Sequence, residues 1–347
     1  MKVKMLLAAW QPLFIALCLG ACQPPPPAPV TLSGLAFFSM PWQVKIARLP
    51  SGADPDALRR RLQGRLDTVN GVLSTYQPDT AVMRFNRTPV GQPFLADPLL
   101  WQAVMTARQV SQATNGVYDI TVGPLVNLWG FGPEAVPERV PAQAEIDRAR
   151  QNVGWRLIQA DEARTTLTRG RDIRLDLSSL GEGVGVDALA AELEKSGVTD
   201  YMISVAGTLR ICGRKPDGSA WQIAIEKPDA SGLPQQLLKL EGCTAVSTSG
   251  AYRNYHEIDG VRYSHTIDPR TGRPITHKGV SVSVVMRQDS AALADAWATA
   301  LNALGPEEGY AVAVKAGIPA YYLEKSGNGF REKLTPSFRP FLGASAP

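Results

Sequence analysis

The sequence has no long hydrophobic segment beyond its first residues, no repeats and little excess of charge of one sign. Only the extreme N-terminus is apolar enough to enter a bilayer, which excludes a protein with several membrane spans. The absence of a heptad run or a fixed-period repeat argues against a coiled coil or a solenoid. The 36 Lys and Arg residues exceed the 32 Asp and Glu residues by only four, so no nucleic-acid partner is expected. With 44% hydrophobic and 20% charged residues, the chain has the composition of a globular protein and not of a disordered one.

Cysteine is also scarce. None of the four cysteines belongs to a CxxC pair or to a Cys/His cluster, so a structural zinc site is not expected. If residues 1–21 are removed as a signal peptide, only Cys212 and Cys243 remain besides Cys22. A disulfide between these two is chemically permitted outside the cytosol, and the sequence leaves open whether they pair.

The first 36 residues indicate secretion and lipid attachment. Two lysines are followed by a clean apolar run, 13–19, which is too short to span a membrane and suits a signal peptide over residues 1–21. The following Leu-Gly-Ala-Cys resembles a bacterial lipobox, in which Cys22 becomes the acylated first residue; a plain secretory signal is the alternative. The proline-rich residues after Cys22 predict an extended tether over 22–36, followed by a folded domain over 37–347.

Helical and strand patterns alternate without a strict βαβ rhythm, which predicts an α+β fold with a mixed, largely antiparallel sheet. No Ser/Gly linker divides the chain, so we expect one compact unit with two lobes. The predicted helices are 56–73, 99–114, 137–152, 186–196 and 290–304. The predicted strands are 42–47, 173–177, 201–205, 221–225, 280–286 and 320–323, with a hairpin turn at Asp259-Gly260.

Two glycine-containing segments are candidates for ligand binding. Residues 116–133 combine Asp, Thr and aromatic side chains with glycines, which allow a ligand to approach the backbone while an aromatic ring stacks on it. A well-packed irregular loop is the alternative. In the segment 176–187, DLSSLGEGVGVD, a glycine-rich turn between a strand and a helix could cradle phosphate. Its G-x-G-x-G spacing departs from G-x-G-x-x-G, so a Rossmann site and a nicotinamide oxidoreductase are poorly supported.

Polar residues of the last third suggest a cation site and a base. Asp295 and Thr299 are four residues apart and therefore share one helix face. Together with loop carbonyls they would offer only oxygen ligands, which suit Mg²⁺. The alternative is that Asp295 caps a neighbouring loop. His265 is one of only three histidines and follows Ser264 in a turn-rich segment, where it could act as a general base or be merely structural.

The ordered set of motifs resembles the ApbE family, the FAD:protein FMN transferases. The resemblance runs from about Met40 to Leu342. Its blocks are Ser74-Thr75-Tyr76 with Phe85-Asn86, Tyr118 to Leu125, Asp176 to Ser179 with Gly181-Glu182-Gly183, Ser247 to Gly250, His265 to Pro274, and Ala294-Asp295-Ala296 with Thr299. The sequence departs from the family pattern at Glu182, where many members have lysine, and at Pro41-Trp42, which replaces a common Gly-Thr.

The resemblance implies an ApbE-like, T-fold-related fold and a specific reaction. Family enzymes cleave FAD at its pyrophosphate, attach the FMN half to a threonine of an acceptor protein through a phosphoester, and release AMP. They require Mg²⁺ and act outside the cytoplasm, commonly as lipoproteins, on subunits of membrane redox complexes. By position, the residues expected to contact FAD are Met40, Tyr76, Val117, Tyr118, Asp119, Asp176, Glu182 and Ile267. The Ser179 backbone, Asp295 and Thr299 would hold Mg²⁺, and His265 would activate the threonine.

Other functions remain open at this stage. An FAD pyrophosphatase would release free FMN and AMP, because water would replace the threonine. A lipid-tethered flavin-binding protein would carry out no chemistry, although binding alone gives no reason for the Asp295/Thr299 pair. We expect the periplasmic side of a bacterial inner membrane, with sorting to the outer membrane as the alternative because Gln23 follows the lipidated cysteine.

Overall fold

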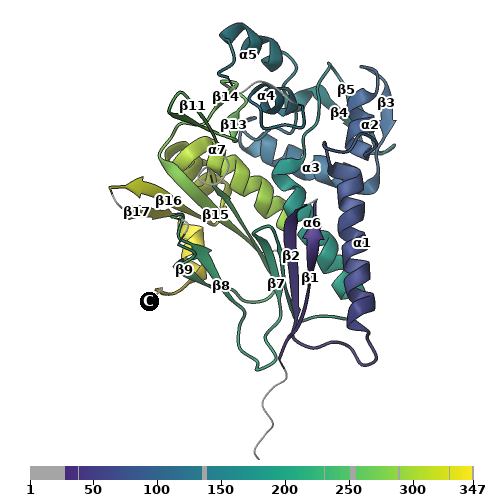
Figure 1. Cartoon of the computed structure of the whole chain (residues 1–347), viewed down its shortest axis with the longest axis vertical. Helices are drawn as coiled ribbons and strands as arrows, with labels where there is room; N and C mark the ends of the chain where they lie inside the picture. Colours follow the sequence, from purple (N-terminus) through teal and green to yellow (C-terminus); the bar gives the residue numbers. More distant parts are fainter. Residues whose placement is uncertain are drawn as a thin grey trace, which may run out of the picture.

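The computed structural model describes residues 28–37, 39–134, 139–229, 231–250, 255–287, 290–327 and 329–345. Its centre is an eight-stranded sheet in which every strand pairing is antiparallel (Figure 1). In spatial order the strands are β1 (Val30–Ala36), β2 (Met40–Ile46), β6 (Tyr201–Val205), β7 (Thr208–Cys212), β10 (Thr244–Gly250), β15 (Gly279–Arg287), β16 (Ala320–Ser326) and β17 (Gly329–Leu334). The expected signal peptide and Cys22 lie outside the described residues.

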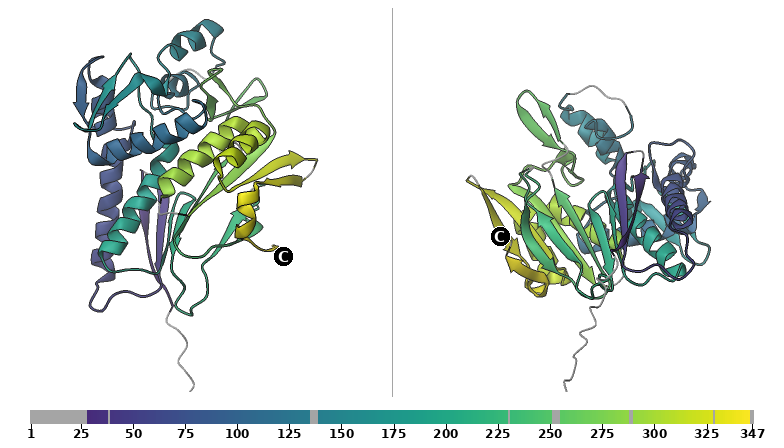
Figure 2. Two further views of the ribbon diagram at one scale, coloured as in Figure 1. Left: turned by 180° about the vertical axis from the view of Figure 1, so that it is seen from behind. Right: turned by 60° about the horizontal axis from the view of Figure 1, so that its bottom comes forward.

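Four long helices cover one face of this sheet (Figure 2, left). They are α1 (Pro55–Leu73), α3 (Pro98–Ala113), α6 (Ser178–Lys195) and α7 (Ala291–Ala316). Helix α1 buries Leu58, Leu62, Leu66 and Val69, which recur at the three- and four-residue spacing of one helix face. These side chains and the inward residues of β2 belong to one large hydrophobic core. No helix in the described part of the chain has the length and apolar character needed to cross a membrane.

A smaller layer covers the opposite face. It contains β8 (Gln222–Glu226), β9 (Pro234–Lys239), β18 (Leu342–Ser345) and the 3₁₀ helix η2 (Pro336–Phe341), which pack over a second hydrophobic core (Figure 1). A disulfide joins Cys212, the last residue of β7, to Cys243, just before β10. Since β7 and β10 are neighbours in the large sheet, the chain leaves and re-enters that sheet at the disulfide, and β8 and β9 lie on the excursion between them.

The remaining elements gather at one end of the large sheet, at the top of Figure 1. They are α2 (Ala81–Arg87), β3 (Pro93–Leu95), α4 (Gly123–Leu128), α5 (Gln143–Arg150), η1 (Trp155–Leu157), β4 (Ile158–Asp161), β5 (Thr166–Arg169), and the hairpins β11 (Tyr255–Ile258) with β12 (Val261–Ser264) and β13 (Ile267–Asp268) with β14 (Arg273–Pro274). Part of this region has its own small core, which includes Leu125, Trp129, Ile146 and Ile267. The expected α+β class and the largely antiparallel sheet are confirmed.

Most predicted elements are present within a few residues of their expected ends. The helices predicted at 56–73 and 99–114 are α1 and α3, and the strands predicted at 42–47, 201–205, 221–225, 280–286 and 320–323 are β2, β6, β8, β15 and β16. The hairpin turn at Asp259-Gly260 joins β11 to β12, and both residues have positive φ angles, 51° and 74°. The helix predicted over 290–304 continues to Ala316 through a kink at Gly305-Pro306.

Four predictions are wrong in their element type or boundaries. Residues 30–36, expected in the tether, form β1, because Leu32 and Ala36 are buried and the whole strand pairs with β2. Residues 173–177 form only an isolated bridge at Arg174 and no strand. Helix α6 begins at Ser178, so the glycines interpreted as a turn lie inside a helix. The helix predicted over 137–152 is limited to the eight residues of α5.

Candidate active site

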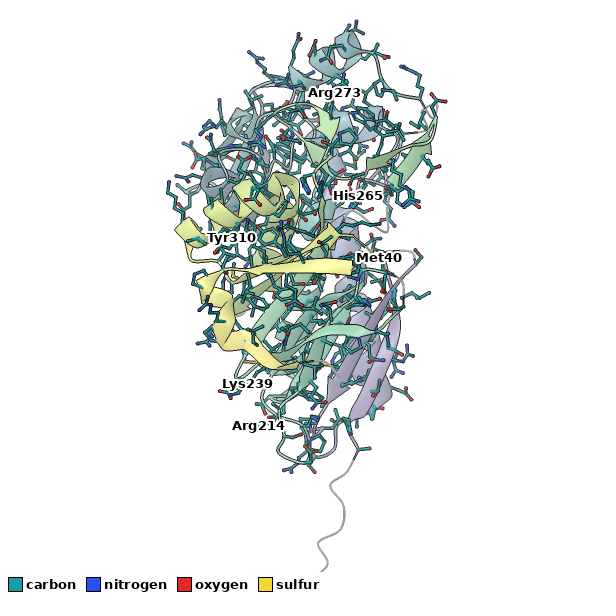
Figure 3. The ribbon with its side chains drawn as sticks, turned by 90° about the vertical axis from the view of Figure 1, so that its left-hand side faces the viewer. Met40, Arg214, Lys239, His265, Arg273 and Tyr310 are labelled. Atoms are coloured by element: carbon teal, nitrogen blue, oxygen red, sulfur yellow. A yellow bond between two sulfur atoms is a disulfide. The ribbon has the colours of Figure 1, made fainter. Side chains whose placement is uncertain are left out.

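A cleft of about 710 Å³ lies at the end of the large sheet where the helices, the strand ends and the small hairpins meet. In Figure 3, Met40 and His265 lie toward this end, whereas Arg214 and Lys239 lie toward the other. Every residue predicted to contact FAD, to hold the metal or to activate the acceptor lines this cleft: Met40, Tyr76, Val117, Tyr118, Asp119, Asp176, Ser179, Glu182, His265, Ile267, Asp295 and Thr299. The fold therefore brings together residues from six separate stretches of sequence, although their individual roles stay predictions.

The acidic centre of the cleft is Asp295 on α7. One carboxylate oxygen accepts the backbone N–H of Gly183 on α6 at 3.0 Å, and the other accepts the Ser247 hydroxyl on β10 at 3.0 Å. Burial, together with the nearby Glu182 carboxylate, holds the pKa of Asp295 well above its usual range. The helices can approach this closely because position 183 is glycine: a Cβ there would lie 2.4 Å from the carbonyl oxygen of Ala291.

A second carboxylate, the half-buried Glu182, lines the same cleft. Burial raises its pKa to about 7, although its carboxylate accepts a hydrogen bond from the Thr208 hydroxyl at 3.2 Å. Thr208 is also 3.0 Å from the Ser247 hydroxyl, so two hydroxyl groups connect the two acids. Two carboxylates this close together, one buried and one half-buried, are stable when they share a proton or a cation.

The oxygen groups around Asp295 fit a magnesium ion. The Thr299 hydroxyl, one turn along α7, donates to the carbonyl oxygen of Ser179 at 3.3 Å. The Ser179 hydroxyl is 2.9 Å from the Tyr118 hydroxyl. Carboxylate, hydroxyl and carbonyl oxygens are hard ligands of the kind that Mg²⁺ prefers. No cluster of three or more His, Cys, Asp and Glu residues suited to a metal is found in the described part of the chain, so a cation here would rely on mixed oxygen donors.

Asp119 is held firmly by its own loop. One carboxylate oxygen accepts the N–H and the hydroxyl of Thr121, at 2.8 and 2.6 Å, and the other accepts the N–H of Trp155 at 2.8 Å. Burial raises the pKa of Asp119, while these hydrogen bonds oppose the rise. The segment that contains Asp176 pairs with this loop, because the Asp176 N–H donates to the carbonyl oxygen of Ile120 at 2.7 Å. The Asp176 carboxylate in turn accepts the N–H of Ser178 at the start of α6.

The mouth of the cleft is apolar and partly exposed. Met40 follows the β1–β2 turn and Tyr76 follows α1, and these side chains are 38% and 58% exposed. Val117 and Ile267 are buried deeper in the lining. An aromatic ring and a thioether at an entrance provide flat, polarizable contact area of the kind that suits a ring-bearing ligand.

His265 lies between hairpins β11–β12 and β13–β14. Its ring contacts the edge of the Phe131 ring, with centroids 6.3 Å apart. The hydroxyl of the following residue, Thr266, accepts a hydrogen bond from the side-chain amide of Asn302 on α7 at 3.2 Å. Further along, Arg270 forms ion pairs with Asp268 at 2.9 Å and with Glu308 at 2.7 Å. Since Glu308 lies on α7, the second ion pair holds the loop against that helix at another point.

The sequence alone does not reveal several of these partners. Ser247 lies within the Ser247 to Gly250 block, but neither its role nor that of Thr208 follows from the sequence, although their hydroxyl groups link Asp295 and Glu182. Asn302 is polar on an otherwise Ala-rich, buried helix, and that contrast is a signal that could have identified it.

Comparisons with known proteins place these features in context. Residues 38–322 match the model of the ApbE family. The chain is 40% identical over 326 residues to the FAD:protein FMN transferase of Vibrio cholerae serotype O1, covering 94% of this chain and 96% of that protein. It is 39% identical over 305 residues to the FAD:protein FMN transferase of Escherichia coli K12, covering 87% and 86%.

Solved structures of flavin transferases have a similar fold. The flavin transferase ApbE from Vibrio cholerae superposes with a TM-score of 0.83 at 39% identity, covering 91% of this chain and 100% of that one. The flavinyl transferase ApbE from Pseudomonas stutzeri, in its apo form, has a TM-score of 0.83 at 38% identity, covering 92% and 98%.

Proposed function

The chain belongs to the ApbE family, and from this membership we propose that it is an enzyme that transfers the flavin of FAD to an acceptor protein. The observation that carries the proposal is the cleft itself, in which the buried Asp295 carboxylate and the half-buried Glu182 carboxylate, a set of oxygen ligands and His265 line one cavity. The finer proposal is that the acceptor group is a threonine hydroxyl, that FMN becomes attached through a phosphoester and that AMP is released.

The reaction forms one P–O bond and breaks another. The threonine oxygen attacks the phosphorus on the FMN side of the FAD pyrophosphate. The bond from that phosphorus to the bridging oxygen breaks, and AMP leaves with the bridging oxygen. The hydroxyl proton passes to the His265 imidazole, because a neutral ring nitrogen can accept a proton as a general base. Transfer of this kind depends mainly on positioning and on balancing charge, which the rigid loops of this cleft favour.

The residues of the cleft divide this work. Asp295, Thr299 and the carbonyl of Ser179 would hold Mg²⁺, which when bound neutralises charge on the diphosphate. Met40 and Tyr76 would contact the flavin or adenine ring at the mouth, while Val117, Tyr118, Asp119, Asp176, Glu182 and Ile267 would shape the inner wall. These assignments rest on the resemblance and on the shared cleft.

A reconstituted transfer reaction tests the function. The purified protein is incubated with FAD, Mg²⁺ and a candidate acceptor, and peptide mass spectrometry locates added FMN while chromatography measures AMP. We expect a flavinylated threonine and an equal amount of AMP. Free FMN in place of labelled acceptor would indicate a pyrophosphatase, and FAD binding without AMP release would indicate a flavin-binding protein.

The base is tested by His265→Ala. We expect the transfer rate to fall by about 10²- to 10⁴-fold, because general base catalysis contributes a factor of this size. FAD binding, measured by fluorescence, is expected to persist, since His265 is one of many lining residues. An unchanged transfer rate would assign the proton to another group.

We further propose that Cys22 is lipidated and anchors the enzyme at the periplasmic side of a bacterial inner membrane, where a membrane redox-complex subunit is the acceptor. The Cys212–Cys243 disulfide supports a location outside the cytosol, because disulfides persist in oxidising compartments. Cys22→Ser is expected to shift the protein from the membrane fraction to the soluble fraction of cell extracts. Unchanged fractionation would remove this cysteine as the anchor.

A further inference from the structure

Two buried hydroxyl groups lie directly behind the acidic centre of the cleft. Thr208 is the first residue of β7 and Ser247 lies within β10, and these residues are 1% and 2% exposed. Alternate residues of a strand point to opposite faces of the sheet, and both of these side chains point to the helix-covered face, where they reach α6 and α7. Along these two strands the cleft is lined by their neighbours Leu209 and Val246.

The pairing of β7 with β10 sets the two hydroxyl groups opposite each other. The register pairs Val246 with Leu209, so the next position along the strands brings Ser247 beside Thr208, and their hydroxyl oxygens are 3.0 Å apart. A two-residue turn, Ala206-Gly207, joins β6 to β7, and its residues have positive φ angles of 51° and 119°. The backbone of Thr208 is therefore held by a tight turn and by strands on both sides.

The hydroxyl groups complete a closed circuit of hydrogen bonds around the two acids. Ser247 donates to one carboxylate oxygen of Asp295 at 3.0 Å, and the N–H of Gly183 donates to the other at 3.0 Å. The Thr208 hydroxyl lies 3.2 Å from the Glu182 carboxylate, and Glu182 directly precedes Gly183 on α6, which closes the circuit. Rotation of the Asp295 carboxylate would therefore break two hydrogen bonds at once.

Within this circuit, Thr208 fixes the hydroxyl group of Ser247. A serine hydroxyl carries one proton and rotates to suit its partners. When that proton points to Asp295, the Ser247 oxygen can only accept, and the Thr208 hydroxyl lies at the right distance to donate to it. Loss of the Thr208 hydroxyl would take this donor from a buried oxygen, which would weaken the hold of Ser247 on Asp295.

We propose that Thr208 is a positioning residue of the transfer reaction, whose hydroxyl keeps the Asp295 carboxylate in one orientation toward the cleft by holding Ser247. The inference rests on the proposed function, because it is there that Asp295 is assigned the Mg²⁺ ion. A carboxylate held in advance by two donors binds a cation without first having to be ordered. Thr208 thus affects the affinity for Mg²⁺ although it lies behind the lining of the cleft.

A matched pair of variants tests this role without the reaction. Thr208→Val removes the hydroxyl and keeps a β-branched side chain in the strand, while Thr208→Ser keeps the hydroxyl. Thermal unfolding is followed during a Mg²⁺ titration, because an ion that binds only the folded state raises the Tm. For Thr208→Val we expect the half-saturating Mg²⁺ concentration to rise about tenfold, as for a lost buried hydrogen-bond partner, and Thr208→Ser to resemble the parent. A lower Tm in chelator with unchanged Mg²⁺ affinity would show a merely structural role and overturn the proposal.

A double variant tests whether Thr208 acts through Ser247. Ser247→Ala is expected to weaken Mg²⁺ binding by at least the same factor, and it carries the test alone if Thr208→Val does not fold. In the variant with both changes, the loss should be smaller than the product of the two separate losses, because residues in one hydrogen-bond network are coupled. Losses that simply multiply would mean independent roles and would overturn the circuit.

The transfer reaction separates this inference from the proposed function. With FAD and an acceptor, the Mg²⁺ concentration for half-maximal transfer should rise in Thr208→Val by the factor found in the unfolding titration, and Thr208→Ser should restore the parent value. A parent enzyme whose Tm does not respond to Mg²⁺ would overturn the inference. A parent enzyme that binds Mg²⁺ but neither labels an acceptor nor releases AMP would overturn the proposed function instead.

Discussion

His277 compensates for a break in helix α7. Pro306 has no N–H, so the carbonyl of Asn302, four residues earlier, has no donor within the helix. The Nε2 of His277 supplies one at 2.7 Å, while the N–H of Gly279 donates to Nδ1 at 3.1 Å. Because one ring nitrogen donates and the other accepts, the imidazole is neutral, and burial lowers its pKa. The side-chain amide of Asn302 also donates to Thr266, next to His265. His277 therefore supports the segment that contains His265 through Asn302.

The lowered pKa of His277 makes stability depend on pH in a defined direction. Above the unfolded-state pKa of about 6.5 the ring is neutral in both states, and the stabilisation is fully present. As the pH falls below that value, the unfolded chain binds a proton first, so the free energy of unfolding decreases. His277→Gln retains a donor and an acceptor without titrating, and we expect a flatter pH dependence in urea unfolding between pH 7 and 5. Parallel curves for the two proteins would show that other groups cause the dependence.

Without a bound cation, the buried Asp295 carboxylate lowers the stability of the fold. Replacing it by asparagine removes a buried negative charge beside Glu182, and the side-chain amide can still accept from Gly183 and donate to the Ser247 hydroxyl. We therefore expect Asp295→Asn to be at least as stable as the parent in chelator but to gain no stability from Mg²⁺. Its transfer rate should fall at least 100-fold. Thermal unfolding with and without Mg²⁺ measures the first effect, and an undiminished Mg²⁺ shift would place the ligands elsewhere.

The contact of helix α6 with helix α7 defines the acidic centre of the cleft. A Cβ at position 183 would lie 2.4 Å from the Ala291 carbonyl oxygen and 2.6 Å from the Ala292 Cα, and these are backbone atoms with little freedom to move. We expect Gly183→Ala to lower the free energy of unfolding by about 1–3 kcal/mol, as overpacking usually does. The same change at Gly181, where a Cβ meets nothing within 4 Å, should instead stabilise by up to about 1 kcal/mol through helix propensity. Urea titrations of both variants check the contrast, and similar values would contradict the packing argument.

The glycines of α6 also show why some elements were mispredicted. Locally, Gly181, Gly183 and Gly185 favour a turn, and nothing within the segment reveals a helix. Gly183 is explained by α7, more than a hundred residues later, and no local pattern contains that contact. Conversely, the sequence predicts α1 nearly residue for residue, because its buried leucines recur at helical spacing and so mark the buried face within the helix itself.

The sequence motifs predict which residues line the site, but they do not predict how these residues are arranged in space. Ordered motifs identify the lining residues, since the blocks are specific when they occur together in this order. The hydroxyl groups of Thr208 and Ser247 connect Glu182 to Asp295 only because β7 and β10 are neighbouring strands. Likewise, β8 lines the cleft because of where its strand lies in the fold. Such adjacency arises from the order of strands in the sheet, which single-sequence patterns do not contain.

The disulfide has a consequence for the whole molecule, because it closes the excursion that carries β8 and β9. The two cysteines are 31 residues apart in sequence, and a closed loop of that size stabilises a fold by about 3–4 kcal/mol in the chain-entropy account. We expect a variant with both Cys212→Ala and Cys243→Ala to lose stability of about that amount in urea. Hydrogen exchange should accelerate more in β8 and β9 than in α6 and α7, which belong to the other core. FAD affinity should change little, since the predicted FAD contacts lie outside the excursion. Uniform acceleration throughout the chain would mean that the bond stabilises the fold as a whole and not the layer that borders the cleft.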